Sequence, residues 1–384
     1  IKGVRSVVRD FEAQWYDPSK EQHVEFDPSF GNPPSSGDDD FRFDLQWGHD
    51  AIDAPEAWNA GYRGSGVKVA VLDTGFDLDH VDLAPNIIGA VSFVPGQGPS
   101  YAFSNAFSHG THVAGTIAAA DNAFGIIGVA PEAKLLLVKV LPDAGSGDFS
   151  WLLQGILYAV SEEADVINMS LGAYLPRNGE NGAYTKEAQE LIVAITRVTN
   201  YAYQKGVTII AAAGNDRIDG NKDQSGIHIP SGVPNVISIS ATAPVGWASD
   251  PTTNLDVFTD YSNYGTGDVA FAAPGGNVWQ SVSNSGGLCT VAGLPRPCYV
   301  FDLVFSTGSN LNPALASYYW SAGTSMASPH AAGVAALIIG KNGGSMAPSQ
   351  VEAAMRASAD DLGKPGKDPY FGHGRVNALR AVTN

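Results

Sequence analysis

Val67-Lys-Val-Ala-Val-Leu72 is a short, almost continuous apolar run rich in β-branched residues. Strands that are covered on both faces have this composition, so we expect a buried strand here. Similar runs follow at residues 134–140, 165–169, 207–213 and 236–241, and helix-like stretches lie between them at residues 111–120, 150–162 and 188–205. Strands and helices that alternate at this spacing predict an α/β fold: a three-layer, doubly wound, mostly parallel sheet with helices on both faces.

A carboxylate stands at the end of that first strand, in Leu72-Asp73-Thr74-Gly75. Open parallel sheets collect catalytic and ligand-binding groups at the C-terminal ends of their strands. Asp73 is therefore a candidate catalytic residue, although an Asp before Thr-Gly is also a common turn.

Two histidines begin the next helix-like stretch, in Ser108-His109-Gly-Thr-His112. A His at the start of a helix can act as a general base. His109 and His112 could instead bind zinc, but neither a His-Glu-x-x-His pattern nor a Cys partner accompanies them, so we discount a zinc site.

A serine opens the most apolar helix-like stretch, in Ser321-Ala-Gly-Thr-Ser325-Met-Ala-Ser-Pro-His330. A Ser at this position is commonly a helix cap. The motif is not the Gly-x-Ser-x-Gly turn of α/β-hydrolases, because Ala327 replaces the second Gly.

Taken together, the three motifs resemble the subtilisin-like (subtilase) family of serine endopeptidases from about Asp39 to the C-terminus. The chain order Asp, His, Ser is that of subtilisin itself, so it is matched here and not deduced. The resemblance implies that Ser325 is the nucleophile, His109 its general base, and Asp73 the group that orients and stabilises the imidazolium. His112 is then expected to support helix packing.

An oxyanion hole is also implied by the resemblance. Ile209-Ile-Ala-Ala-Ala-Gly-Asn215 matches the family segment that supplies a side-chain amide, here that of Asn215. The backbone N–H of Ser325 would be the second donor.

Substrate-binding residues follow from the same resemblance. An extended peptide can add to backbone edges as an extra strand, and Gly leaves room for it. The expected backbone edges are Gly145, Ser146 and Gly147 on one side and Ser170, Leu171 and Gly172 on the other. Ala212, Ala213 and Gly214 would form one wall of the S1 pocket, and Phe149, Leu152 and Leu171 would form an apolar S4 pocket. Leu152 could equally be an ordinary core side chain. Asp216 and His228 are polar pocket positions that leave the P1 preference open, and Ile229-Pro230 falls where the family has a cis proline.

A calcium site is the one cofactor that the resemblance implies. Calcium prefers oxygen ligands from carboxylates, amides and carbonyls. The expected ligands are the side chains of Asp82 and Asn122, the carbonyls of Ala120, Phe124 and Ile126, and a carboxylate from Asp39, which we favour over Asp38 and Asp40. A second oxygen-rich run, residues 216–223, could hold another ion or be a solvated loop.

Composition restricts the possible partners. The 384 residues carry a formal net charge of −17, which disfavours nucleic acid and anionic membrane surfaces. No apolar run approaches the length of a membrane span. The two cysteines, Cys289 and Cys298, suit a local disulfide better than two free thiols, and a disulfide indicates an oxidising, extracellular compartment.

Residues 1–38 differ from the rest and are interpreted as an N-terminal arm or linker, or as a propeptide remnant, ahead of a catalytic domain at residues 39–384. Lys2–Val8 resembles the last strand of the family's inhibitory propeptide, which predicts a propeptide inhibitor and a zymogen. The chain begins at Ile1 and not at Met, which we interpret as removal of upstream residues. Residues 275–319 resemble an insertion, and we expect them to shape a substrate subsite.

The resulting hypothesis is a secreted, monomeric, calcium-dependent serine endopeptidase that degrades polypeptides with broad specificity. A specific processing protease is the alternative that Asp216 and the acidity favour. A catalytically silent relative is disfavoured by the complete set of motifs.

Overall fold

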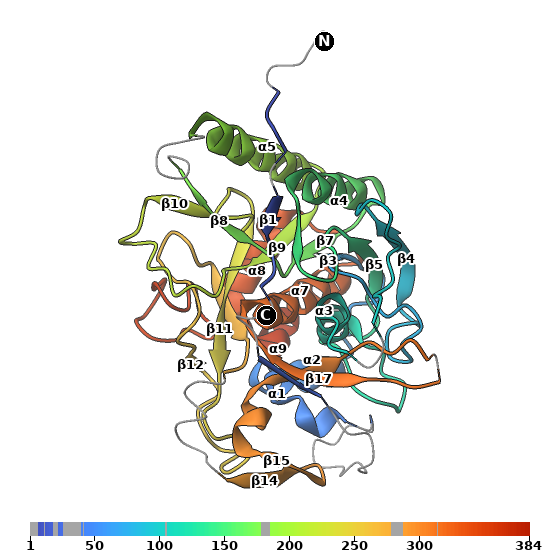
Figure 1. Cartoon of the computed structure of the whole chain (residues 1–384). Helices are drawn as coiled ribbons and strands as arrows, with labels where there is room; N and C mark the ends of the chain where they lie inside the picture. The colour runs from blue at the N-terminus through green and yellow to red at the C-terminus, as the bar shows by residue number, and fades with distance from the viewer. Residues whose placement is uncertain are drawn as a thin grey trace.

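The computed structural model describes residues 7–10, 12–17, 22–25, 40, 42–103, 106–177, 185–277, 287–312 and 314–384. Its central sheet is built from the apolar runs identified in the sequence (Figure 1). In spatial order the strands are β12 (Val257–Phe258), β11 (Ile237–Ala243), β9 (Thr208–Ala212), β7 (Val166–Met169), β3 (Lys68–Asp73), β5 (Lys134–Lys139) and β4 (Ile87–Ser92), and β13 (Phe271–Pro274) also pairs with β11. All of these pairings are parallel except β11 with β12, so the predicted mostly parallel sheet is confirmed.

Helices cover both faces of this sheet because successive strand residues point to opposite sides. Val69 and Val71 belong to one buried core, and Ala70 and Leu72 belong to the other. The first core lies under α3 (His109–Ala118), α7 (Thr324–Lys341), α1 (Trp47–Ala51), α2 (Ala54–Asn59), α8 (Pro348–Ser358) and α9 (Ala378–Thr383). The second core lies under α4 (Phe149–Ser161) and α5 (Thr185–Gln204).

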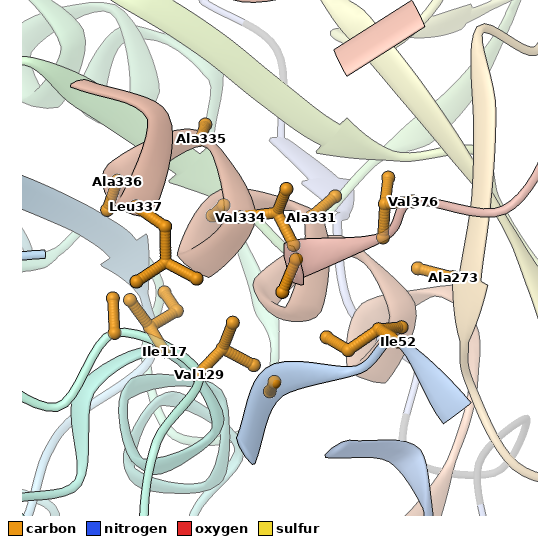
Figure 2. Close-up of a cluster of buried hydrophobic side chains, with 14 of the residues drawn as sticks. Ile52, Ile117, Val129, Ala273, Ala331, Val334, Ala335, Ala336, Leu337 and Val376 are labelled. Atoms are coloured by element: carbon orange, nitrogen blue, oxygen red, sulfur yellow. The ribbon is translucent and has the colours of Figure 1, made fainter. Parts of the chain in front are cut away.

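Helix α7 is buried on every side from Thr324 to Ile339. Figure 2 shows Val334 and Leu337 of this helix packed in one cluster with Ile117 of α3 and with Val129. Small residues allow such close packing: a Cβ added to Gly333 would lie 2.5 Å from the Cβ of Val129. The helix that begins beside Ser325 is thus anchored in the largest core of the protein.

The segment from residue 287 to Ala322 forms a lobe with its own core of Phe301, Phe305 and Trp320. It contains the hairpin β14 (Leu288–Val291) and β15 (Leu294–Pro297), the short helix η3 (Cys298–Asp302), and the strands β16 (Val304–Thr307) and β17 (Tyr318–Ala322). The predicted disulfide is present, because Cys289 and Cys298 are joined at one end of the hairpin.

The lobe lies against the helix that begins with His109. Strand β16 packs on α3, and Ser306 and Thr307 donate hydrogen bonds to carbonyls of that helix. None of the described residues of the lobe before Thr324 lines the cavity beside Ser325. The expectation that the insertion shapes a substrate subsite stays a prediction, because this cavity is only one part of the cleft and β17 pairs with Gln22–Glu25 of the arm.

Three short elements complete the description: η2 (Phe43–Leu45) and the antiparallel pair β8 (Ala173–Pro176) with β10 (Gly226–Ile229). Two strands of the N-terminal arm also pair with the body, β1 (Glu12–Gln14) with β6 (Ser146–Asp148) and β2 (Gln22–Glu25) with β17. Figure 1 shows β1 in front of the sheet, between the helices of the two faces. Within the described ranges, no helix is both long and apolar enough to cross a bilayer.

Candidate active site

Asp73 and His109 meet at the C-terminal edge of the sheet. Asp73 is the last residue of β3, and His109 is the first residue of α3. The imidazole Nδ1 lies 2.7 Å from Oδ1 of Asp73, and both side chains are almost completely buried. A buried carboxylate at this distance favours the tautomer with hydrogen on Nδ1, which leaves Nε2 as the basic atom.

Local hydrogen bonds hold this pair in place. The backbone N–H of Thr74 donates to Asp73 Oδ1 (2.7 Å), and the Thr74 hydroxyl accepts from the N–H of Gly110 (3.0 Å). Ser108 caps α3, because its Oγ accepts from Thr111 N–H and donates to the carbonyl of Gly75. The strand end and the helix start are therefore joined by bonds that fix the spacing of the two catalytic candidates.

Ser325 lies in the first turn of α7, with only 5 % of its surface exposed. Its hydroxyl donates to the carbonyl of Ser170 (3.1 Å), and Ser170 Oγ donates in return to the carbonyl of Ser325 (2.8 Å). Because its hydrogen is bonded to the carbonyl of Ser170, the Ser325 hydroxyl must turn before it can donate to a base. The helix N-terminus favours negative charge at this position.

Asn215 is oriented by the residue that precedes Ser325. Its Oδ1 accepts from both the backbone N–H (2.9 Å) and the hydroxyl (2.8 Å) of Thr324. Because Oδ1 is fixed in this way, the Nδ2 amide group is on the opposite side, and Asn215 lines the same cavity as Ser325. The arrangement can present an N–H donor to a developing oxyanion.

Two residues that support Asn215 were missed in the sequence. Thr324 was visible as a neighbour of Ser325 but has no motif of its own for this role. Asn263 accepts from the N–H of Asp216 (3.1 Å) and Ile218 (2.9 Å) and donates to the carbonyl of Ala213 (2.8 Å). Nothing in the local sequence around Asn263 predicts these contacts, which depend on the packing of distant loops.

The predicted substrate edges are occupied by the chain's own arm. Glu12–Gln14 pairs antiparallel with Ser146–Asp148, and the N–H groups of Trp15 and Tyr16 donate to the carbonyl of Gly145 (3.1 and 3.2 Å). The N–H of Gly172 donates to the carbonyl of Trp15 (2.8 Å). Both edges thus bind an extended peptide between them.

The side chains of the arm fill two hollows. Trp15 packs against Phe149, with ring centroids 5.7 Å apart, and donates from Nε1 to the carbonyl of Gly147 (2.7 Å). Tyr16 lies on His109, with ring centroids 3.9 Å apart. Leu152 is a fully buried member of the adjoining core, which agrees with the alternative interpretation of that residue.

The cavity beside Ser325 has a volume of about 590 Å³. Of the predicted pocket residues, the structure brings Leu171, Gly172, Ala212, Gly214, Asp216 and His228 to this cavity, while Ala213 lines a smaller one behind it. The peptide bond Ile229–Pro230 is cis, as the resemblance implied.

His112 has a structural environment. It is buried, and its Nε2 lies 3.2 Å from the carbonyl of Val304 and 3.1 Å from that of Tyr319. Among the residues that the structure describes, no group of three or more His, Cys, Asp or Glu side chains could bind a metal. The zinc alternative therefore gains no support.

The predicted calcium loop surrounds Asp82, which is fully buried. Asp82 Oδ2 accepts from the N–H of Ile126 (3.0 Å) and from the hydroxyl of Tyr318 (2.9 Å), while Oδ1 is buried without a hydrogen-bond partner in the described structure. Burial raises the pKa of Asp82 to about 7. An unpartnered buried carboxylate oxygen in a loop that also carries Asn122 suits a cation.

Asp40 completes this loop in the described structure. It is buried, and its carboxylate accepts from the N–H of Ala123 (2.9 Å) and Asn122 (3.5 Å). Asp39, the carboxylate favoured from the sequence, lies outside the described residues. The second oxygen-rich run forms a hydrogen-bonded loop, in which Asp219 pairs with Lys222 and Asp223 accepts from Ser225.

Comparisons with known proteins agree with this geometry. A family model described as the subtilase family, peptidase S8, matches residues 64–374. A subtilisin from Bacillus pumilus is 34 % identical over 338 residues, which cover 88 % of this chain and 98 % of the relative. Among solved structures, a lanthipeptide protease superposes with a TM-score of 0.70 at 29 % identity, covering 88 % of this chain and 95 % of that one. A protease from Pseudoalteromonas arctica superposes with a TM-score of 0.66 at 31 % identity, covering 92 % and 99 %.

Proposed function

This chain belongs to the subtilase family of serine peptidases, and we propose that Asp73, His109 and Ser325 are the residues with which it hydrolyses peptide bonds. The observation that carries the proposal is the buried 2.7 Å contact between Asp73 Oδ1 and His109 Nδ1. Tyr16, which lies on His109, lines the same cavity as Ser325 and Asn215. The roles are those established for subtilisin itself.

The proposed reaction is acyl transfer in two steps. His109 Nε2 takes the proton of Ser325 as Oγ attacks the scissile carbonyl carbon, and Asp73 stabilises the imidazolium that forms. Collapse of the tetrahedral intermediate breaks the C–N bond, and His109 returns the proton to the leaving amine. Water then hydrolyses the acyl-enzyme by the same route in reverse.

Asn215 Nδ2 and the backbone N–H of Ser325 would stabilise the oxyanion. Both donors exist before substrate binds, because Thr324 fixes the amide of Asn215 and α7 fixes the backbone of Ser325. Donors that are already oriented cost no reorganisation when charge develops.

Calcium is proposed as a structural ion. Asp82, Asp40 and Asn122 with the carbonyls of Ala120, Phe124 and Ile126 would hold it, and Asp39 remains a further candidate. The ion would supply positive charge to the partnerless Oδ1 of Asp82 and keep the loop closed against Tyr318. Secretion is proposed with it, since the disulfide between Cys289 and Cys298 suits an oxidising compartment.

The arm is proposed to inhibit the enzyme in the manner of a propeptide. Residues 12–17 lie along the substrate edges, and residues 22–25 pair with β17, which leads into Ser325. The arm thus contacts both sides of the catalytic centre. In the sequence, four residues of the arm, 18–21, lie between these two segments. The bond after Asp17 joins it to Pro18, a tertiary amide whose ring hinders in-line attack.

The favoured substrate range is broad, as in a degradative endopeptidase that acts as a monomer. Support comes from edges that bind backbone atoms, which every peptide possesses. A processing protease is the second candidate, favoured by the polar residues Asp216 and His228 beside the cavity and by the likeness to a structure named a lanthipeptide protease.

A labelling experiment tests the catalytic assignment. A fluorophosphonate probe should modify Ser325, identified by peptide mass, in proportion to the loss of casein hydrolysis. Labelling elsewhere with full loss of activity would contradict the proposal.

A second experiment tests inhibition by the arm. Trp15→Ala with Tyr16→Ala should raise the initial rate on small peptides, because the arm loses its contacts with Phe149 and His109. Val7→Ala, an exposed change in the same arm, is the control and should leave the rate unchanged. Equal rates for the two variants would remove the arm from the regulation of this enzyme.

A further inference from the structure

Three residues, Tyr174, Ile218 and His228, line both the cavity beside Ser325 and a smaller cavity next to it. His228 thus lines the first cavity, of about 590 Å³, and also the second cavity, of about 30 Å³, behind it. The second cavity is lined by Ser231 and Asn263, which do not reach the first. His228 therefore forms part of the partition between the two.

The ring of His228 reaches both glycine walls of the first cavity. A Cβ built on Gly172 would lie 2.2 Å from Cε1 and 2.8 Å from Nε2 of His228, and a Cβ on Gly214 would lie 2.6 Å from Nε2. The edge that carries Nε2 thus spans the gap between the walls. Gly172 and Gly214 are needed to admit the ring, and the ring takes space that a large substrate side chain would need.

The orientation of this ring is fixed from behind. Nδ1 of His228 lies 2.7 Å from the hydroxyl of Ser231. His228 also belongs to β10, where it pairs with Tyr174 of β8. When the Ser231 hydroxyl donates to Nδ1, the neutral ring carries its hydrogen on Nε2, on the side of Gly172 and Gly214.

We propose that His228 makes the S1 pocket of this enzyme short and polar, and that it selects substrates with a short P1 side chain that accepts a hydrogen bond, aspartate or asparagine. This inference rests on the proposed function, because it assigns the specificity of the same site and narrows the broad substrate range proposed above at the P1 position. An apolar P1 side chain offers no acceptor to Nε2–H, and a large one would meet the ring.

The chain's own arm supplies a first example of such a side chain. Tyr16 lies on His109, and the next residue, Asp17, lines the cavity together with His228, Asn215 and Ser325. An arm that binds as an extended peptide therefore places a short carboxylate side chain where the P1 residue belongs.

Asp216 sets a limit on this preference. It lines the same cavity, and its backbone N–H is held by Asn263. A carboxylate here disfavours a P1 aspartate relative to asparagine by charge repulsion, while both keep the acceptor for His228. Asparagine is therefore expected to be the better of the two P1 residues.

The test uses the full chain and peptidyl coumarin amides that carry Gln-Trp-Tyr before a variable P1 residue. We measure ratios of kcat/KM between P1 residues, because occupancy of the cleft by the arm lowers all rates by the same factor and cancels in a ratio. Asparagine should exceed phenylalanine and lysine by about tenfold or more. Equal or faster cleavage after phenylalanine or lysine would overturn the inference.

Two variants separate the effect of pocket size from that of the hydrogen bond. His228→Gly joins the two cavities and should reverse the ratio of asparagine to phenylalanine. Ser231→Ala keeps the pocket short but releases Nδ1, so it should lower the rate for asparagine several-fold and leave that for phenylalanine unchanged. Ser161→Ala, an exposed change at the end of α4 that lines neither cavity, is the matched control and should alter neither. Unchanged ratios in both pocket variants would exclude His228 as the determinant.

Failure of the proposed function would look different. A chain that cleaves neither these peptides nor denatured casein would contradict the endopeptidase assignment. A chain that degrades casein but prefers a large P1 residue would contradict only the role of His228.

Discussion

The proposed catalytic centre and the loop around Asp82 each contain a buried carboxylate, but the two carboxylates have different partners. Around Asp73, His109 and Asn215, the protein supplies its own partners: backbone N–H groups, the Ser108 cap and the two donors of Thr324. Around Asp82, the carboxylate accepts from neutral donors, the N–H of Ile126 and the hydroxyl of Tyr318. One oxygen of each carboxylate, Oδ2 of Asp73 and Oδ1 of Asp82, is buried without a hydrogen-bond partner in the described structure.

This difference indicates which component stabilises each region. Asp73 faces the imidazole of His109, which can carry the compensating positive charge. A buried carboxylate with a raised pKa and an orphan oxygen needs a cation or a proton to offset the cost of burial. We therefore expect chemistry to depend on the first region and stability to depend on the second.

The largest expected effect lies in the first region. Ser325→Ala should lower turnover roughly 10⁶-fold, the loss known for removal of the nucleophile in subtilisin, while the melting temperature stays close to that of the parent. Turnover and melting should be measured on one preparation. Near-normal peptidase activity in the folded variant would contradict the assignment of Ser325 as the nucleophile.

Calcium removal should act on the second region. An ion that binds only the folded state stabilises it by about 4 kcal/mol at 1,000 times its dissociation constant. Melting of the Ser325→Ala protein with and without chelator, together with metal analysis, measures this loss without autolysis.

Two substitutions form a matched pair for that experiment: one is expected to remove the calcium site, and the other is expected to keep it. Asp82→Asn should abolish the effect of chelator on the melting temperature. Asp121→Asn, in the same loop but partly exposed and bonded to Arg63, should retain it. A chelator effect that survives in Asp82→Asn would place the ion elsewhere.

The oxyanion donor should have a smaller effect than the nucleophile. Asn215→Ala should cost on the order of 10²–10³ in kcat, the loss known for the corresponding amide in subtilisin. Thr324→Val removes one of the two donors that orient Asn215 and should cost less, with KM nearly unchanged. Thr116→Val, a buried change that removes a bond within α3, is the control. A control as damaging as Thr324→Val would show that packing and not orientation is responsible.

The smallest predicted effect concerns a pair of buried histidines and the pH dependence of the free energy of unfolding. His49 and His330 lie with ring centroids 5.3 Å apart, and burial lowers the pKa of both, that of His330 to about 4. The unfolded chain then binds protons more readily than the folded one. Stability from His330 is therefore complete above about pH 6.5 and is lost as pH falls toward 4, by roughly 3 kcal/mol.

Denaturant unfolding of the Ser325→Ala protein between pH 7.5 and 4 measures this loss. His49→Val should reduce the slope in that window, because one of the two buried bases is removed. An unchanged slope would mean that carboxylates alone determine the acid sensitivity.

The sequence by itself determined the parallel sheet, the order of Asp73, His109 and Ser325, and the disulfide. These are properties of local runs and short spacings: β-branched runs form buried strands, and a motif next to a strand end or helix start lies at a predictable edge. The edge residues Gly145–Gly147 could be named only through the resemblance to the subtilase family.

Only the tertiary structure decided which distant groups complete these sites. Tyr318 donates to Asp82, which lies 236 residues earlier in the sequence, and Thr324 orients Asn215, which lies 109 residues earlier. The N-terminal arm pairs with Ser146–Asp148 at the substrate edge, far along the chain from the arm itself. The position of His228 between Gly172 and Gly214 is of the same kind. Such contacts depend on how loops pack against one another, and packing satisfies buried polar atoms with whichever partner the fold brings near, regardless of separation along the chain.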